Sequence, residues 1–353
     1  MASKKNILVA PINWGLGHAT RCIPLIEELL KNDYNVIIAS DGQSLNLLKK
    51  EFPTLKAIEL PPYNIKYPKK GYLFKWKMIS QCVSIKRTIR RERKSVSRLV
   101  QTEELSGIIS DGRLGVRSSK IPSVYITHQI NILTGTTTSI SSLIHQFYIK
   151  KYKVCWVPDD SRRVAGLSGK MGHPKNRNLN IRYLGILSRL EKKELPISIE
   201  YLAIISGPEP QRSLLEKILI QKLRDYKGKV VLVQGIISEK QVWQKVGNID
   251  MVNFMQAEEL EEYMNKSSVI ISRSGYSTIL DLAKLKKKAF FIPTPGQYEQ
   301  EYLARRMQHL GLVPCCEQDK FSLEHLSRAQ VYLGINLELP TIDMSKLFEV
   351  FHN

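Results

Sequence analysis

The chain has 353 residues, of which 43% are hydrophobic and 24% charged, as in folded globular proteins and unlike disordered ones. No apolar run approaches the about 18 residues that a membrane-spanning helix needs, and the first apolar run is too short for a signal peptide, so we expect a cytoplasmic protein. The formal net charge of +20 indicates attraction to polyanions such as phosphorylated substrates, anionic membranes or nucleic acid.

The first predicted strand, residues 6–11, runs into a glycine turn, Gly15-Leu16-Gly17-His18, and then into an amphipathic helix. Glycine allows a sharp turn and close approach to a ligand, and the helix start offers free N–H groups. The third glycine of the dinucleotide-binding fingerprint is missing. His18 is therefore a candidate general base, because histidine titrates near neutrality. The alternative is a histidine that caps the helix or packs within the turn.

Residues 74–100 form a predicted long basic helix, rich in Lys and Arg with a single Glu, whose apolar residues follow helical spacing. One interpretation is a solvated helix face. Another is a helix that lies on an anionic membrane, because Leu73, Phe74 and Trp76 stand at its start. Nucleic-acid binding is disfavoured, because no nucleic-acid-binding signature accompanies the charge.

A polar loop follows the strand predicted at 123–127 and carries His128, Gln129 and Asn131. Several hydrogen-bonding groups on one loop suit a hydroxylated substrate, although such a loop can also be held by its own side chains. The five cysteines form no C-x-x-C pair and are expected to be reduced. No His/Cys group has metal-ligand spacing, so no structural zinc is expected. No cofactor is expected either.

Strands and helices alternate through both halves of the chain, which predicts parallel sheets with helices on both faces. We therefore expect an α/β protein with two doubly wound, Rossmann-like domains. The predicted division is a first domain at 1–187, a linker at 188–198, a second domain at 199–335, and a segment at 336–353 that returns to the first domain. Ligands bind beyond the carboxyl ends of such strands, so two facing domains would hold a ligand in the cleft between them.

The second half carries its strongest motif at Ile270–Pro293, where a strand ends and Ser274-Gly275 opens a helix. Its first turn, with the Ser274 and Thr278 hydroxyls and the Arg273 charge, could hold a phosphate, and Asp281 could accept hydrogen bonds from ribose. The alternative is an ordinary serine N-cap followed by an exposed Asp. Further candidates at strand ends are Ser206 and Gly207 for phosphate, and Glu299 and Gln300 at a helix start.

Together these motifs resemble the GT-B glycosyltransferases of the family 28 type, exemplified by the enzyme that adds N-acetylglucosamine to the lipid-linked peptidoglycan precursor. The glycine turn resembles the family's N-terminal Gly-rich loop ending in His, and 128–131 resembles its His-Glu-Gln-Asn loop, with Gln129 in place of the acid. "SRSGYSTILDLA" is similar to its Ser-Arg-Ser-Gly-Ala-x-Thr-x-x-Glu motif, with Asp281 in place of Glu. The likeness spans residues 6 to about 316 and is more specific in the second half.

The resemblance implies a metal-independent, inverting transfer of a sugar, such as an N-acetylhexosamine, from a UDP-sugar co-substrate to a hydroxyl acceptor. It implies His18 as catalytic base, with Gly15, Gly17, Arg21, His128, Gln129 and Asn131 on the acceptor side. It implies donor phosphate contacts by Arg189, Ser206, Gly207, Arg273, Ser274, Gly275 and Thr278. It implies nucleoside contacts by Phe254, Met255, Leu260 and Asp281, and sugar contacts by Glu299 and Gln300.

Because the first half matches less closely, the acceptor is not carried over from the family; a lipid-linked or cell-envelope glycan at the inner face of the membrane is expected from the basic segment. Two other functions stay open. Arg21 fits the Gly-x-Gly-His-x-x-Arg loop of the UDP-sugar hydrolase of pseudaminic acid synthesis, in which the histidine would activate water. A basic scaffold that binds polyanions without catalysis is the third interpretation.

Overall fold

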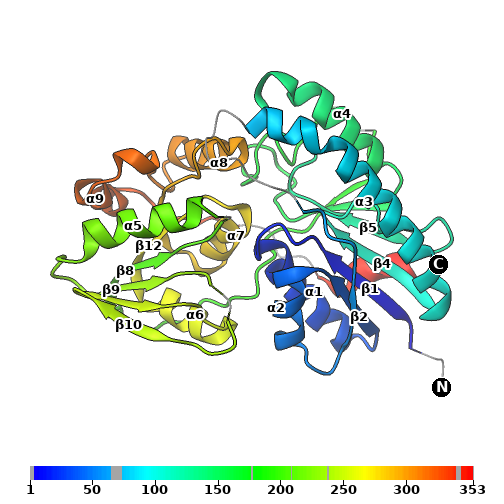
Figure 1. Cartoon of the computed structure of the whole chain (residues 1–353), viewed down its shortest axis with the longest axis horizontal. Coiled ribbons are helices and arrows are strands. Elements are labelled where there is room, and N and C mark those ends of the chain that lie inside the picture. Colours follow the sequence, from blue (N-terminus) through cyan, green and yellow to red (C-terminus); the bar gives the residue numbers. More distant parts are fainter. Residues whose placement is uncertain are drawn as a thin grey trace. The chain divides into compact units, whose positions relative to one another are not determined.

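The structure is a computed structural model, which describes residues 4–64, 74–175, 178–207, 209–236, 238–338 and 343–352; the side chains of 74–82 lie outside this description. The described residues fall into two compact units (Figure 1). The first takes its residues from the N-terminal part of the chain up to Leu187 and from the C-terminal segment, and the second from 188–338.

The first unit is built on a seven-stranded sheet in the order β3-β2-β1-β4-β5-β6-β7, in which every neighbouring pair is parallel. Its strands are β1 (Asn6–Pro11), β2 (Asn35–Ser40), β3 (Lys56–Glu59), β4 (Leu105–Asp111), β5 (Ser123–Ile126), β6 (Val154–Val157) and β7 (Ile181–Tyr183). Its helices are α1 (Gly17–Lys31), α2 (Gly42–Glu51), α3 (Phe74–Thr102) and α4 (Thr138–Ile149), with short η2 (Gly135–Thr137) and η4 (Ser345–Phe351).

Helix α3 packs most of its described apolar residues against the core of the first unit. Ile89 and Val96 are buried, and Leu99 and Val100 pack against the core cluster around Leu8 and Ile108. The arginines and lysines between 86 and 98 are exposed on the opposite side. From residue 85 onward the helix is therefore a solvated basic face over a core-packed apolar stripe, whereas Val83 is exposed. The start of the basic segment lies outside the described side chains.

The C-terminal segment packs in the first unit. Leu347, Phe348 and Phe351 of η4 are buried, and a Cβ built on Gly107 of β4 would lie 2.3 Å from the Phe351 ring. Since only glycine leaves this space, β4 and η4 pack at close range.

The second unit contains a six-stranded sheet in the order β10-β11-β9-β8-β12-β13, parallel except for the antiparallel β10–β11 pair. Its strands are β8 (Ile199–Ile204), β9 (Val230–Val233), β10 (Trp243–Val246), β11 (Ile249–Val252), β12 (Ser267–Ser272) and β13 (Lys288–Phe291). Its helices are α5 (Gln211–Leu223), α6 (Ala257–Asn265), α7 (Tyr276–Leu285), α8 (Tyr298–His309) and α9 (Leu323–Val331), with η3 (Gln318–Lys320).

Two features differ from the sequence analysis. Strand β10 was not expected. The apolar sequence at 313–315 favours a strand, but the structure forms only a single bridge there, between Phe291 and Cys315. The doubly wound architecture of both units is confirmed. In the first sheet the chain order reverses between β1 and β4, and in the second between β8 and β12, and these are the positions at which such sheets bind ligands.

Candidate active site

The predicted base, His18, lies at the switch point of the first sheet. Its turn follows β1, and Pro11, the last residue of β1, pairs in register with Asp111, the last residue of β4. His18 Nδ1 is 2.8 Å from Asp111 Oδ1, and the His18 side chain is 20% exposed while that of Asp111 is fully buried. The Asp111 carboxylate thus holds the His18 ring, and part of the ring stays accessible to solvent.

Arg21, one helical turn after His18, completes this cluster. Its Nε donates to Asp111 Oδ2 at 2.5 Å, and its Nη2 donates to Asp111 Oδ1, so the guanidinium binds the carboxylate with two bonds. Nη1 of Arg21 lies 3.1 Å from Nδ1 of His128. Because a guanidinium can only donate, Nδ1 of His128 is the acceptor of this bond.

Asp111 and Arg21 favour different tautomers of His18, because Arg21 Nη2 also lies 2.8 Å from His18 Nδ1. The arginine favours a lone pair on Nδ1, whereas the carboxylate favours a proton there. We assign the proton to Nδ1, since the bond to a buried carboxylate is charge-assisted and Arg21 already donates to both carboxylate oxygens. The Nε2 lone pair is then available to accept a proton.

The electrostatics keep this histidine neutral. Burial lowers the pKa of His18, and the Arg21 charge lowers it further, which together outweigh the opposite effect of Asp111. Burial alone would raise the pKa of Asp111, but Arg21 and His18 reverse this and hold it well below its usual value. Near pH 7 the cluster therefore contains an ionised Asp111, a charged Arg21 and a neutral His18.

Gly112, directly after Asp111, leaves room for the imidazole. Its φ is +77°, and a Cβ there would lie 2.7 Å from Ile12 Cγ2 and 3.2 Å from His18 Cε1. Any larger residue would be strained and would press on the His18 ring.

The predicted acceptor loop lies next to this cluster through His128, which is buried. Gln129 is half-buried. Asn131 holds its own loop, because its Nδ2 donates to the Lys170 carbonyl at 2.7 Å and its Oδ1 accepts from Gln146 at 3.0 Å. The structure thus brings together Arg21, His18 and His128, and uses Asn131 to fix the loop.

The second unit places its predicted phosphate residues at the other switch point, where Ile204 of β8 pairs with Ser272 of β12. Ser206 and Gly207 are exposed, and Gly275 and Thr278 at the start of α7 are half-buried. The positive φ of Gly207, +105°, sets the loop after β8. Main-chain N–H groups at the α7 start and the loop at Ser206 and Gly207 lie beyond adjacent strands, an arrangement suited to phosphate.

Arg273 and the Ser274 hydroxyl do not belong to a phosphate site, which corrects the sequence analysis. Arg273 is fully buried and donates to the carbonyls of Ile292, Pro293 and Gln211 and to the Gln318 side chain. These hydrogen bonds fix the surrounding loops. Ser274 Oγ donates to the Gln300 carbonyl at 2.7 Å. Both side chains follow β12, whose last four residues are buried, and turn into the interior.

Gln300 is buried, and its Oε1 accepts from the Thr294 N–H at 2.8 Å, so it fixes the loop after β13. Glu299 in the first turn of α8 is half-buried. Of the two predicted sugar contacts, Gln300 is therefore engaged in positioning the loop.

Asp281 on α7 accepts a hydrogen bond from Ser188 Oγ at 2.6 Å, and the Arg189 charge acts on it. Burial raises the pKa of Asp281 to about 6. Asp281 and Arg189 thus lie in one cluster with Ser188, which the sequence analysis did not select. The residues predicted to contact the nucleobase follow β11. Phe254 and Leu260 are half-buried and Met255 is buried.

Asp111 is the candidate site residue that the sequence analysis missed. The available signal was an acidic residue followed by glycine at the end of an apolar strand, in "GIISDG". Among the described residues, no group of three or more His, Cys, Asp or Glu side chains could hold a metal ion.

Comparison with known proteins gives consistent matches. Residues 202–336 match the glycosyltransferase family 28 C-terminal domain. The chain is 24% identical over 320 residues to an "Uncharacterized glycosyltransferase" of Methanosarcina acetivorans, covering 84% of this chain and 80% of the relative. It is 26% identical over 140 residues, 38% of each chain, to the UDP-N-acetylglucosamine--N-acetylmuramyl-(pentapeptide) pyrophosphoryl-undecaprenol N-acetylglucosamine transferase of Sulfurihydrogenibium. The crystal structure of Acinetobacter baumannii MurG matches with a TM-score of 0.58 at 13% identity over 99% of both chains.

Proposed function

For a chain that is a GT-B glycosyltransferase carrying a family 28 C-terminal domain, we propose that it moves a sugar from a UDP-sugar to a hydroxyl acceptor with inversion. The observation that carries the proposal is the His18–Asp111 pair at the switch point of the first sheet. In this proposal the first unit activates the acceptor and the second binds the donor.

His18 is the proposed general base. Its Nε2 accepts the proton of the acceptor hydroxyl as that oxygen forms a bond to the anomeric carbon, and the bond from this carbon to the diphosphate breaks. Attack from the side opposite the diphosphate inverts the anomeric centre. Asp111 acts as a positioning residue, because its bond to Nδ1 orients the ring and stabilises the imidazolium that forms.

UDP leaves with increased negative charge on its diphosphate. The α7 start at Gly275, the Thr278 hydroxyl and the loop at Ser206 and Gly207 are the proposed contacts for that charge. Arg189 is proposed to add a positive charge. Stabilisation by these groups leads us to propose that no metal is required, so transfer should persist after treatment with EDTA.

The sugar is proposed to be an N-acetylhexosamine, the donor type that the Sulfurihydrogenibium relative's printed name gives. The acceptor is proposed to be a glycan carried at an anionic membrane. The exposed cations of α3 between residues 86 and 98 support the second proposal.

A UDP-sugar hydrolase is the second candidate, and the observation in its favour is Arg21, whose contact with both histidines would suit a site that orients water. The interpretation as a non-enzymatic scaffold is set aside, because the chain is a glycosyltransferase.

The test has two parts. A panel of nucleotides and nucleotide sugars is screened by thermal shift, because a ligand that binds only the folded state raises Tm. UDP release from the best donor is then measured with and without candidate acceptor glycans, for the parent and for His18→Ala. Acceptor-dependent release that H18A lowers supports transfer. Equal release without any acceptor supports the hydrolase, and full activity of H18A refutes the base assignment.

A further inference from the structure

Helix α4 exposes four large apolar side chains and buries the polar side chains of Ser142 and His145. Ile140, Leu143, Ile144 and Phe147 are 63%, 67%, 56% and 58% exposed. They stand at positions i, i+3, i+4 and i+7, which is one continuous stripe along a helix. The buried side includes Ser142 and His145, whose ring nitrogen pairs with the Tyr125 hydroxyl. A surface helix of a globular domain normally has the opposite orientation.

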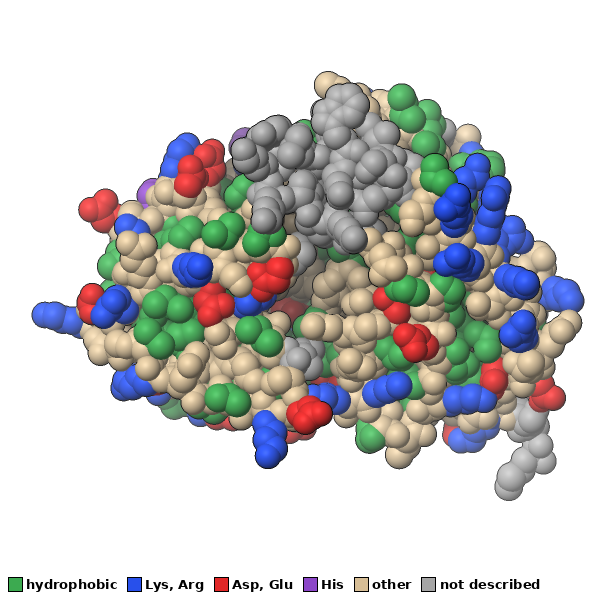
Figure 2. Space-filling model, viewed as in Figure 1, with side chains coloured by type: hydrophobic (Ala, Val, Ile, Leu, Met, Phe, Trp, Pro, Cys, Tyr) green, Lys and Arg blue, Asp and Glu red, His purple; other side chains and the backbone are tan. Residues whose placement is uncertain are grey.

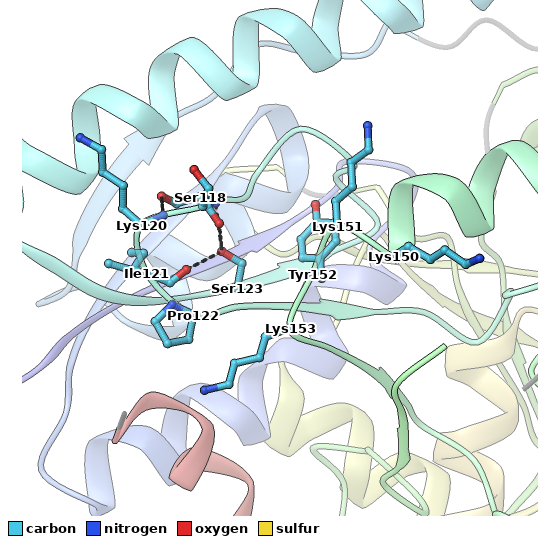
Figure 3. Close-up of a pocket in the computed structure, with 10 residues that line it drawn as sticks. Ser118, Lys120, Ile121, Pro122, Ser123, Lys150, Lys151, Tyr152 and Lys153 are labelled. Carbon is cyan, nitrogen blue, oxygen red and sulfur yellow. Dashed lines mark hydrogen bonds between the residues drawn. The ribbon is translucent and has the colours of Figure 1, made fainter. Parts of the chain in front are cut away.

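Positive charge lies at the C-terminal end of the same helix. Lys150, Lys151 and Lys153 follow α4 directly, and with Lys120 they line an open pocket that also contains Tyr152 (Figure 3). Lys151 Nζ lies 4.0 Å from the centre of the Phe147 ring, so the charge and the apolar stripe meet. Among the described residues, Lys120, Lys150 and Lys151 make no ion pair.

Two neighbouring arginines, Arg117 and Arg93, add positive charge near these lysines. Burial lowers the pKa of Lys151, and the charges of Arg117 on the β4–β5 connection and Arg93 on α3 lower it further. Tyr148 of α4 packs against the cluster of Ile12, Tyr63 and Ile89, which places α4 beside α3. Figure 2 shows hydrophobic side chains over α4 next to Lys and Arg side chains over α3.

The arrangement of the lysines distinguishes between kinds of anion. In Figure 3 the four side chains point away from one another, so a single small anion cannot contact them all. A broad negative surface can. Nucleic acid would satisfy the charges and leave the four apolar side chains of α4 in water, whereas a bilayer of anionic lipids satisfies both.

We propose that the α4 docking surface, defined as Ile140, Leu143, Ile144 and Phe147 with Lys120, Lys150, Lys151 and Lys153, binds an anionic lipid bilayer. The apolar stripe enters the headgroup boundary and the lysines contact lipid phosphates. This goes beyond the proposed function, because vesicle binding is measured without sugar transfer. It also assigns the apolar part of the membrane contact to α4, because Val96, Leu99 and Val100 of α3 are packed in the core.

The full chain is tested by flotation with vesicles of phosphatidylcholine alone and of phosphatidylcholine with phosphatidylglycerol. The variants are Leu143→Asp/Phe147→Asp and Lys150→Glu/Lys151→Glu, and the matched control is Val331→Asp, which adds a charge at an apolar residue of α9 that is 82% exposed. All replaced side chains are exposed, and an unchanged melting temperature verifies folding.

We expect binding to the anionic vesicles only, weakened by 0.5 M salt. We expect it to weaken at least about tenfold in L143D/F147D and about fivefold for each lysine reversed. The control should bind like the parent. Phe147→Trp should add a blue-shifted emission when anionic vesicles are added. Unweakened binding of L143D/F147D, equal binding to neutral vesicles, or an F147W emission that vesicles do not change would each overturn the proposal.

Discussion

Replacing Asp111 by Asn tests whether one buried carboxylate organises the site of the first unit. Asp111 is fully buried and faces Arg21, which is 2% exposed, so the substitution leaves a buried guanidinium without its counter-charge. Breaking a buried ion pair by removing one partner costs about 3–5 kcal/mol. Asn keeps the shape and one acceptor oxygen, so the loss reports charge rather than a cavity.

The assay is urea unfolding of the parent, Asp111→Asn and Asp111→Asn/Arg21→Met at pH 7. The double variant has no unpaired cation, and we expect it to be more stable than D111N alone. The pH dependence has a definite sign. The pKa of Asp111 is lowered on folding, so its contribution is complete above the unfolded value of about 3.9 and is lost as pH falls toward the folded value.

The free-energy gap between the parent and D111N should therefore be constant from pH 5 to 7 and narrow in more acidic solution. A loss below about 1 kcal/mol at pH 7, or a gap that widens on acidification, would refute the ion-pair reasoning.

Three further predictions concern single residues. His18→Ala should lower turnover about 100-fold or more with an unchanged Tm. Burial and Arg21 lower the pKa of His18, so the rate of the parent protein should rise with pH and reach a plateau by about pH 7, which a pH–rate profile checks. Gly112→Ala should destabilise more than Gly15→Ala in urea unfolding, because both have φ +77° but only a Cβ at Gly112 meets His18 and Ile12; equal losses would contradict the crowding argument. Asp281→Asn should stabilise the folded protein by about 1–3 kcal/mol at pH 8 and not at pH 4. Burial raises the pKa of Asp281 to about 6, so its ionisation opposes folding as pH rises from 4 to 6. Thermal melts of the parent and the variant at both pH values test this prediction.

Local patterns made most of the fold predictable. Strands such as Asn6–Pro11 and Asn35–Ser40 contain continuous apolar runs, because parallel strands covered on both faces bury nearly all of their side chains. The bounds predicted for the first strand, 6–11, agree with the structure. The glycine turn before His18 was recognisable because the residues that form it are adjacent in sequence.

Non-local contacts were not predictable from these patterns. Asp111 lies 93 residues from His18 in sequence, and only the parallel pairing of β1 with β4 brings them together. Arg273 was read as a phosphate ligand because Arg beside a helix start suits an anion, yet the carbonyls that capture it come from distant loops. Strand β10 has exposed residues and no apolar run, although the Gly247-Asn248 turn that joins it to β11 is a hairpin signal.

The return of the C-terminal segment has a consequence for how the enzyme is divided. The chain leaves the first unit after Leu187 and re-enters it with η4, so a polypeptide ending at 187 would lack Leu347, Phe348 and Phe351 and would expose the apolar wall that they cover. Each of these side chains contributes about 1.5–3 kcal/mol by its burial. The N-terminal half is therefore not an autonomous fragment, and a soluble version of it needs residues 343–352 supplied as a fused or separate peptide.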